Sequence, residues 1–236
     1  MLVLFVLMTA IGSKSYRSYV EVIGHDVKSQ SPDFEMLMMI KQNVSYDETE
    51  RIFSKSKKEE HEYVDLGLPS GLKWATCNVG ADIPEDYGDY YAWGERKTKK
   101  TYTIKNSVTD GEEFGEISGD SKYDVARVNW SEEWRMPTKT EVQELFDNCE
   151  WEWVTQKNVD GYKVTSKTNG NSIFLPATGY CEGKSFYNVG KSGEYWTSTP
   201  HQSIPNYSNS IYLDSKTIGI STGSRFFGKC VRPVTE

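Results

Sequence analysis

Residues 134 to 153 read Trp134-Arg-Met-Pro-Thr-Lys-Thr-Glu-Val-Gln-Glu-Leu-Phe-Asp-Asn-Cys-Glu-Trp-Glu-Trp153. Pro137 supplies a turn, and Thr138 is followed three residues later by Glu141. This spacing is that of a capping box, in which each side chain satisfies a backbone N–H that the first helical turn leaves unpaired. We therefore predict a helix that begins at Thr138.

The apolar side chains after this start fall on one helical face. They are Val142, Leu145, Phe146 and Cys149, at positions i, i+3, i+4 and i+7. After Cys149 the period changes to two, because Trp151 and Trp153 alternate with glutamates. That alternation is typical of a half-buried strand. The helix should therefore lead directly into a strand whose tryptophans face the core.

The aromatic and sulfur residues are unevenly distributed along the chain. All seven Trp and all four Cys lie beyond residue 73. We therefore expect one compact domain over residues 62 to 236, long enough to bury a core without a metal or a partner. The formal net charge is −7 and no long basic run occurs. Nucleic acid is therefore not expected as a partner, since phosphates require a positive surface.

The N-terminus begins with an apolar run that is too short to span a bilayer. Residues 1–13 are predicted to be a secretory signal segment, with a buried N-terminal strand or helix as the alternative. An exported protein is expected, at the cell surface, in the periplasm or outside the cell, without a transmembrane span. Residues 14–61 are polar and mixed in charge, which predicts a linker, with a short helix after Ser31-Pro-Asp33 as the alternative to disorder.

Short strands are expected through the rest of the chain. A hairpin is predicted within residues 63–80, and residues 96–122 read as a long exposed excursion. An antiparallel meander should follow the helix, with strands at 151–156, 162–166 and 172–176 and turns at Asp160-Gly161 and Asn169-Gly170. Further strands are expected at 194–199, 210–213 and 230–234. The fold class is therefore α+β, with curved antiparallel sheets, one or two helices and long loops.

An ordered set of motifs covers nearly all of residues 62 to 236. It consists of Tyr63-Val-Asp-Leu-Gly-Leu-Pro-Ser-Gly71, Trp74-Ala-Thr-Cys-Asn-Val-Gly-Ala81, Tyr87-Gly-Asp-Tyr-Tyr-Ala-Trp-Gly-Glu95, Trp134-Arg-Met-Pro-Thr138, Phe174-Leu-Pro-Ala-Thr-Gly179, Tyr195-Trp-Thr-Ser198 and Val231-Arg-Pro-Val234. This set resembles the Fibrobacter succinogenes major paralogous domain family. The resemblance implies a C-type-lectin-like domain, related to formylglycine-generating-enzyme-like domains, in exported and surface proteins of bacteria. It bears on fold and compartment more than on activity.

The C-terminal loops are the predicted binding surface of a module for an extracellular glycan or protein. Their aromatic rings and amides suit flat, polar ligands. The candidate ligand-binding residues are Trp196, His201, Asn206, Tyr207, Asn209, Tyr212, Arg225 and Phe227. The alternative for each residue is that the rings belong to the core and the amides form turns. At the level of the whole protein, the alternative to a binding module is a structural surface or cell-envelope protein.

An enzyme is the second alternative, because the resemblance extends to relatives that use a reactive cysteine pair or a His-rich iron site. Cys181 and Cys230 are the candidates for such a pair. Of the three histidines, His25 and His61 precede the domain, so an iron triad cannot be assembled within it from histidine. No pair of nucleophile and base with a recognisable motif is present. A protein without catalytic activity is therefore predicted, and no catalytic residue is assigned.

No cofactor is predicted. Calcium-dependent lectins supply Glu-Pro-Asn or Gln-Pro-Asp and Trp-Asn-Asp runs, whereas Ile204-Pro-Asn206 lacks the acid. An acidic stretch of the excursion is the alternative cation site; it contains Asp110, Glu112, Glu113, Glu116 and Asp120. The four cysteines, Cys77, Cys149, Cys181 and Cys230, leave two alternatives open, disulfides in an exported chain or buried free thiols.

Overall fold

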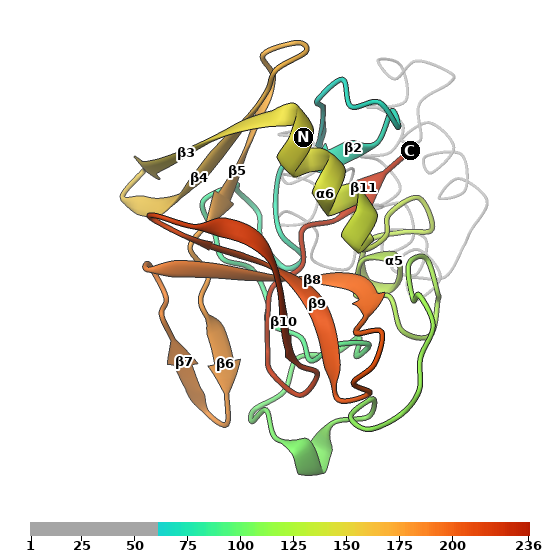
Figure 1. Ribbon diagram of the computed structural model, residues 1–236. Helices are drawn as coiled ribbons and strands as arrows, with labels where there is room; N and C mark the ends of the chain where they lie inside the picture. The colour runs from blue at the N-terminus through green and yellow to red at the C-terminus, as the bar shows by residue number, and fades with distance from the viewer. Residues whose placement is uncertain (1–60) are drawn as a thin grey trace, which may run out of the picture. The chain divides into compact units, whose positions relative to one another are not determined.

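The computed structural model describes residues 61–236 (Figure 1). They belong to a compact unit that begins at Glu60. The expected signal segment at 1–13 and nearly all of the expected linker at 14–61 lie outside the described residues. No helix among residues 61–236 has the length and apolar character needed to cross a membrane.

The fold consists of small antiparallel sheets and few helices, which agrees with an α+β or mainly β class. The helices are η1 (Ile104–Asn106, a 3-10 turn), α5 (Val125–Asn129) and α6 (Lys139–Asn148). The strands are β1 (Tyr63–Asp65), β2 (Lys73–Ala75), β3 (Cys149–Gln156), β4 (Val159–Ser166), β5 (Ser172–Pro176), β6 (Tyr180–Glu182), β7 (Ser185–Tyr187), β8 (Ser192–Pro200), β9 (Tyr207–Asp214), β10 (Ile218–Ser224) and β11 (Val234–Thr235). The sheet orders are β1-β2-β11, β3-β4-β5, β8-β9-β10 and β6-β7.

Helix α6 begins as its sequence predicts. The Thr138 hydroxyl accepts from the backbone N–H of Glu141 at 3.2 Å, and the Glu141 carboxylate accepts from the Thr138 N–H at 2.7 Å. The Nη1 and Nη2 groups of Arg135 each donate a hydrogen bond to the same carboxylate, at 2.9 and 2.7 Å. The capping box is therefore confirmed, and Arg135 fixes its glutamate from outside the helix.

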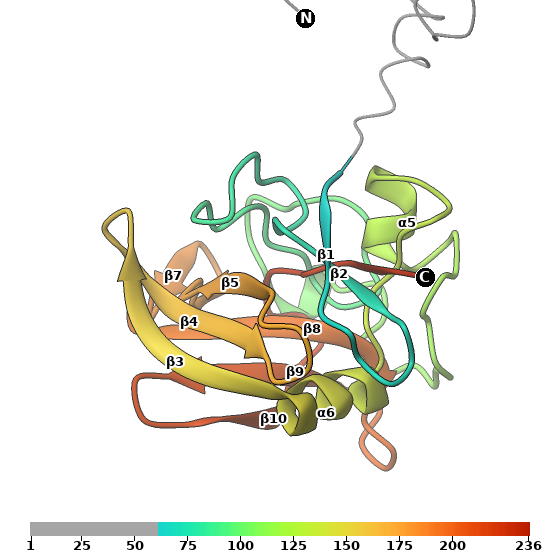
Figure 2. The ribbon, with the colours of Figure 1, turned by 90° about the horizontal axis from the view of Figure 1, so that it is seen from above.

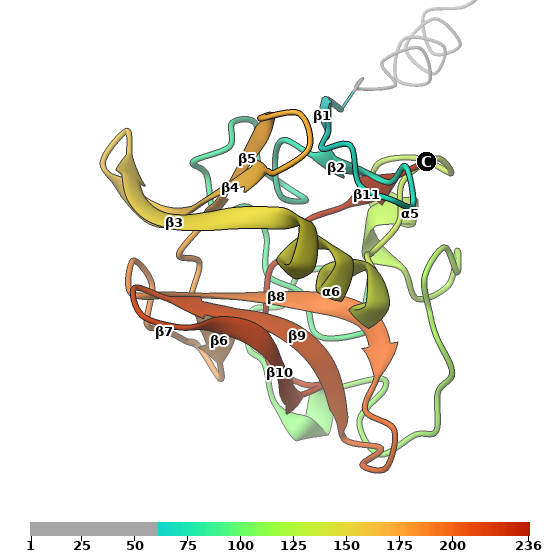
Figure 3. The same ribbon diagram turned by 45° about the horizontal axis from the view of Figure 1, so that its top comes forward.

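The apolar stripe of α6 lies in the main core. Figure 3 shows α6 between the β3-β4-β5 sheet and the β8-β9-β10 sheet. Val142 and Leu145 are fully buried there, and Trp151 and Trp153 of β3 pack against the same cluster. The change of period after Cys149 is confirmed as the passage from helix to strand.

The predicted hairpin at the start of the domain is also present. Tyr63 pairs with Ala75, so β1 and β2 are antiparallel. The C-terminal β11 pairs with the other edge of β2, where Val234 lies opposite Trp74. In Figure 2 the three strands lie side by side, which brings the first and last described strands of the chain together.

The meander β3-β4-β5 is confirmed, but its first turn was predicted at the wrong residues. The chain reverses at Lys157 and Asn158, whose φ angles are 46° and 66°. Asp160 and Gly161 lie inside β4. Gly161 is required there by packing, because a Cβ at this position would overlap the Leu175 carbonyl oxygen of β5.

Candidate functional site

Two tyrosines lie on one face of the β6-β7 hairpin. Tyr180 pairs directly with Tyr187, and their rings stack with centroids 5.3 Å apart. Tyr187 is 43% exposed, whereas its neighbour Phe186 points to the opposite face, where it packs edge-on against Tyr90. The hairpin therefore presents a tyrosine pair on one side and a single phenylalanine on the other.

The tyrosine pair continues across the C-terminal sheet. Gly179 forms a parallel bridge with Gly193, so the next residues along the two strands, Tyr180 and Glu194, lie on the same face. Glu194 of β8 is in turn opposite Tyr212 of β9. Four strands thus place Tyr187, Tyr180, Glu194 and Tyr212 in one line.

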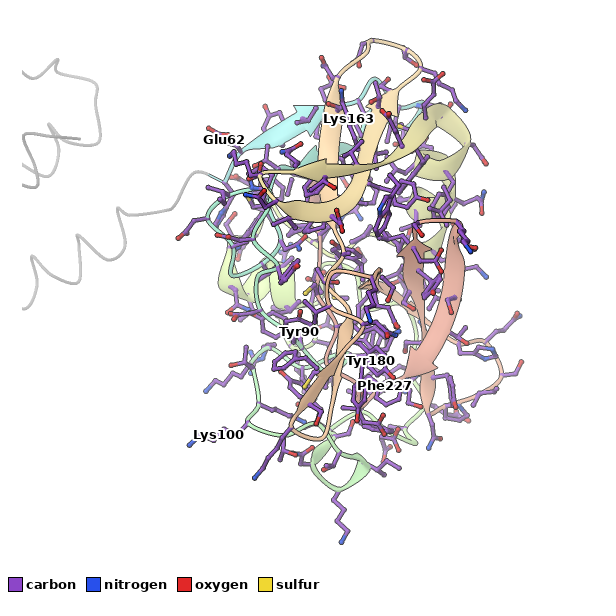
Figure 4. All side chains as sticks on the ribbon, turned by 90° about the vertical axis from the view of Figure 1, so that its left-hand side faces the viewer. Glu62, Tyr90, Lys100, Lys163, Tyr180 and Phe227 are labelled. Atoms are coloured by element: carbon purple, nitrogen blue, oxygen red, sulfur yellow. The ribbon has the colours of Figure 1, made fainter. Side chains whose placement is uncertain are left out.

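Phe227 joins this line from the segment after β10. Its ring centroid lies 5.2 Å from that of Tyr180. Figure 4 shows the two labelled side chains close together between the β6-β7 hairpin and the C-terminal sheet, with Tyr90 beyond them. We refer to Tyr187, Tyr180, Glu194, Tyr212 and Phe227 together as the cross-strand row.

The cross-strand row is accessible because the apolar cluster that covers the rest of this face of the β8-β9-β10 sheet does not extend over it. Farther along the same strand as Glu194, Trp196 is 1% exposed within a second apolar cluster. Glu194 and Tyr212 are only half-buried. Gly219, which pairs with Tyr212, has no atom of another segment within 4 Å of where a Cβ would stand. This end of the face therefore stays accessible to a ligand.

A buried ion pair underlies the centre of the row. The Nζ of Lys229 lies 2.6 Å from Glu194 Oε2, and the Lys229 side chain is 1% exposed against 16% for Glu194. The same Nζ donates to the Ser210 hydroxyl at 3.0 Å and lies 4.3 Å from the centre of the Trp196 ring. Burial lowers the pKa of Lys229, and the Glu194 carboxylate opposes that shift.

Two phenols of the row, those of Tyr180 and Tyr212, have a raised pKa. Burial, together with Glu182 and Glu194, raises the pKa of Tyr180. The pKa of Tyr212 is raised because its O–H donates to the Asp214 carboxylate, at 2.8 Å. The row therefore offers aromatic faces and hydroxyl groups together with one carboxylate whose position is fixed.

The structure places two of the predicted ligand-binding residues, Tyr212 and Phe227, in the row, but three others belong to the interior. Trp196 donates its indole N–H to the Tyr91 carbonyl at 2.9 Å. Asn209 is 6% exposed, and its amide donates to the Thr199 and Pro200 carbonyls at 3.2 and 2.9 Å.

Arg225 is 1% exposed and donates to the Thr109 and Glu112 carbonyls at 3.0 and 2.7 Å. Trp196, Asn209 and Arg225 are therefore buried with their polar atoms used inside the fold, which corresponds to the alternative of core rings and structural polar groups.

Of the other three predicted residues, His201 and Asn206 lie on the loop between β8 and β9, and Tyr207 is the first residue of β9. His201 Nδ1 accepts from the Ser203 and Ile204 N–H groups, each at 3.1 Å. Asn206 donates to the Asp110 carboxylate at 3.1 Å. Tyr207 is 37% exposed. These contacts stabilise the loop locally, and none of the three residues is part of the cross-strand row.

All four cysteines are free thiols, and the structure contains none of the disulfides that were the other alternative. Burial raises the pKa of Cys149 to about 11. Burial also raises the pKa of Cys181 and Cys230, which are 2% and 0% exposed. Buried thiols of this kind are protonated and behave as small apolar side chains.

Sequence reasoning missed Tyr180, Tyr187, Glu194 and Lys229. A local signal was present, since Tyr180-Cys-Glu-Gly-Lys-Ser-Phe-Tyr187 carries aromatic residues on both sides of a Gly-Lys pair that suits a turn. Gly183 does adopt a φ of 60° there. The isolated bridge between Gly179 and Gly193 has no such signal, so the line through Glu194 appears only in the folded chain.

No group of three or more His, Cys, Asp or Glu side chains within residues 61–236 is arranged to hold a metal ion. Comparisons of the chain with models of known protein families, with curated proteins and with solved structures find no match.

Proposed function

We propose that the chain is an exported module that binds a glycan or protein ligand outside the cell, without catalysing a reaction. The observation that supports this most is the cross-strand row, which gathers accessible aromatic side chains from several strands on a rigid sheet. Aromatic groups exposed together in this way are typical of recognition surfaces. Tyr187 in particular contributes little to the core, since it is 43% exposed.

The fold we propose for this module is the C-type-lectin-like one of the family that its motifs resemble. Small curved antiparallel sheets, one longer helix and a first and a last strand that share one sheet support that proposal. The absence of catalysis is supported by the state of the candidate thiols, because Cys181 and Cys230 are buried and their raised pKa values disfavour the thiolate.

Two neighbouring substitutions test this function. The full chain and its Tyr187→Ala and Phe186→Ala variants are compared on a glycan array and in pull-downs from extracellular protein. Phe186 is the matched control, because it is the more exposed ring, at 58%, on the same strand but on the other face. Loss of one aromatic anchor should weaken binding by about tenfold in Tyr187→Ala only.

Equal binding by both variants would show that the row is not the binding surface. The absence of any ligand on the array and in the pull-downs would favour the structural envelope protein instead. Conversion of a thiol or peptide substrate that stops in a Cys181→Ser variant would contradict a protein without catalytic activity.

A further inference from the structure

We infer that the ligand of the cross-strand row is a neutral glycan, with a sugar ring packed on the exposed ring of Tyr187, which is stacked on Tyr180, and its hydroxyl groups donating to Glu194. This inference rests on the proposed function and selects one ligand class within it. Recognition of the sugar would require no metal, because every group that contacts it belongs to a side chain.

The first reason is the mixture of groups in the row. A pyranose ring has a face of C–H groups, which carry a small positive charge, and a rim of hydroxyl groups. The electron-rich face of a tyrosine attracts the C–H face. An ionised carboxylate only accepts hydrogen bonds, so it matches a ligand that is rich in O–H donors. Tyr187, the exposed ring of the stacked pair, provides the first kind of group, and Glu194, beside Tyr180, provides the second.

The second reason is that Glu194 is held in place before a ligand arrives. Lys229 binds its Oε2 at 2.6 Å from beneath, and Lys229 itself is fixed by Ser210 and by the Trp196 ring. Among the described residues, no hydrogen bond reaches Oε1, so this oxygen is available to a hydroxyl group of a ligand. A carboxylate fixed in this way loses little conformational entropy on binding.

The third reason concerns what Lys229 contributes to the fold. A buried ion pair gives little net stability, and apolar replacements are often as stable or more so. Stability alone therefore does not explain a lysine at this position. The lysine is explained by its effect on Glu194, because it orients the carboxylate and neutralises its charge. Lys229 is accordingly a positioning residue, since it lies beneath the surface and acts on the ligand through Glu194.

The surroundings of the row disfavour the other ligand classes. Glu182 lies near Tyr180, and Asp214 accepts from Tyr212, so acidic groups flank the row on two sides. Phosphates and other anions would be repelled. A protein partner of ordinary affinity would need about 800 Å² on each side, which is far more than a few rings provide.

Titration calorimetry with defined sugars tests this inference. The full chain is titrated with neutral oligosaccharides, namely cellohexaose, xylohexaose, mannohexaose and laminarihexaose, each with and without a chelator. At least one should bind equally well in both conditions. Glu194→Gln and Tyr180→Ala should each lower its affinity by about tenfold, because the first removes the accepting carboxylate and the second removes the ring on which Tyr187 is stacked. Glu150→Gln, an exposed acid on β3, should bind as the unmodified chain does.

Lys229→Met separates positioning from folding. Affinity for the same sugar should fall several-fold, and the midpoint of thermal unfolding should also fall, because removal of Lys229 leaves the Glu194 carboxylate without its partner. A fall in the unfolding midpoint without loss of affinity would show that Lys229 is purely structural.

Two results would overturn the inference. If a neutral sugar binds but Glu194→Gln and Tyr180→Ala bind it unchanged, the sugar site lies elsewhere. If no neutral sugar binds while a protein is retained through Tyr187, the ligand class is wrong although the proposed function stands. If neither class of ligand depends on Tyr187, the proposed function fails with it.

Discussion

Glu141 links the helix start to its surroundings through one carboxylate. It accepts from the Thr138 N–H and from both guanidinium nitrogens of Arg135, and the two charged side chains are each 19% exposed. Burial alone would raise the pKa of Glu141, but Arg135 and Thr138 outweigh burial and hold it below its usual value.

Glu141→Gln should therefore destabilise the fold in a pH-dependent way. A carboxylate whose folded pKa is lowered contributes stability above its unfolded pKa of about 4.3, and that stability is lost as the pH falls through the folded pKa. We expect Glu141→Gln to cost about 2 kcal/mol at pH 7 and progressively less below pH 4. Urea unfolding at pH 7 and below pH 4 measures this cost in the free energy of unfolding. The exposed Glu150→Gln serves as control, and a cost for Glu141→Gln that does not change with pH would contradict this account.

Single residues also show where sequence reasoning succeeds and where it stops. Thr138 and Glu141 were predictable because every atom of the capping box lies within four residues of chain. Trp196 was assigned to the surface and Tyr187 was not, although Trp196 is 1% exposed and Tyr187 is 43% exposed. Residue type does not determine burial, which here depends on which segments cover each face of β8 and β7.

Among the elements, the β3-β4-β5 meander contains two glycines with different roles. Gly161 lies within β4, where a Cβ would overlap the Leu175 carbonyl oxygen and lie 2.8 Å from Pro176 Cα. Gly170 lies in a turn with a φ of 76° and has no neighbour within 4 Å of a Cβ. An Asp-Gly pair indicates a turn in sequence, but here the glycine serves close packing between strands.

Alanine substitutions should distinguish the two glycines. Gly161→Ala forces apart two backbones that cannot yield easily, which should cost about 3 kcal/mol. Gly170→Ala only strains one residue in the left-handed region, at about 1 kcal/mol. Chemical denaturation of both variants provides the comparison. Similar costs would mean that Gly161 is not closely packed against β5.

The elements that carry the site illustrate why it could only be predicted in part. Tyr212 and Phe227 were both predicted as ligand-binding residues, because their aromatic side chains are visible in the sequence of the C-terminal region. Their partners come from β6, β7 and β8, and the parallel bridge at Gly179 and Gly193 that aligns them leaves no periodic trace. Contacts between distant strands depend on the whole sheet, whereas turns and caps depend on a few residues.

At the scale of the whole molecule, Arg225 connects the C-terminal sheet to the excursion at 96–122. Its guanidinium lies 4.4 Å from the centre of the Trp93 ring and donates to the Thr109 and Glu112 carbonyls, more than a hundred residues earlier in the chain. It also donates to the Ser208 hydroxyl of β9 at 3.0 Å. One buried cation thus joins a long irregular segment to β9 and to Trp93.

Arg225→Met should release this excursion. Methionine approximates the volume but leaves the two carbonyls without donors, at a cost of about 3 kcal/mol. Arg96→Met is the matched control, because Arg96 also binds a carbonyl of the excursion, that of Ser121 at 3.4 Å, but from an exposed position. We expect a glutamate-specific protease to cleave Arg225→Met after Glu112, Glu113 or Glu116 much faster than it cleaves Arg96→Met. Equal cleavage rates would show that Arg225 does not hold the excursion. The excursion would then be held by other contacts, such as the hydrogen bond from the Thr109 hydroxyl to the Trp93 carbonyl at 2.6 Å.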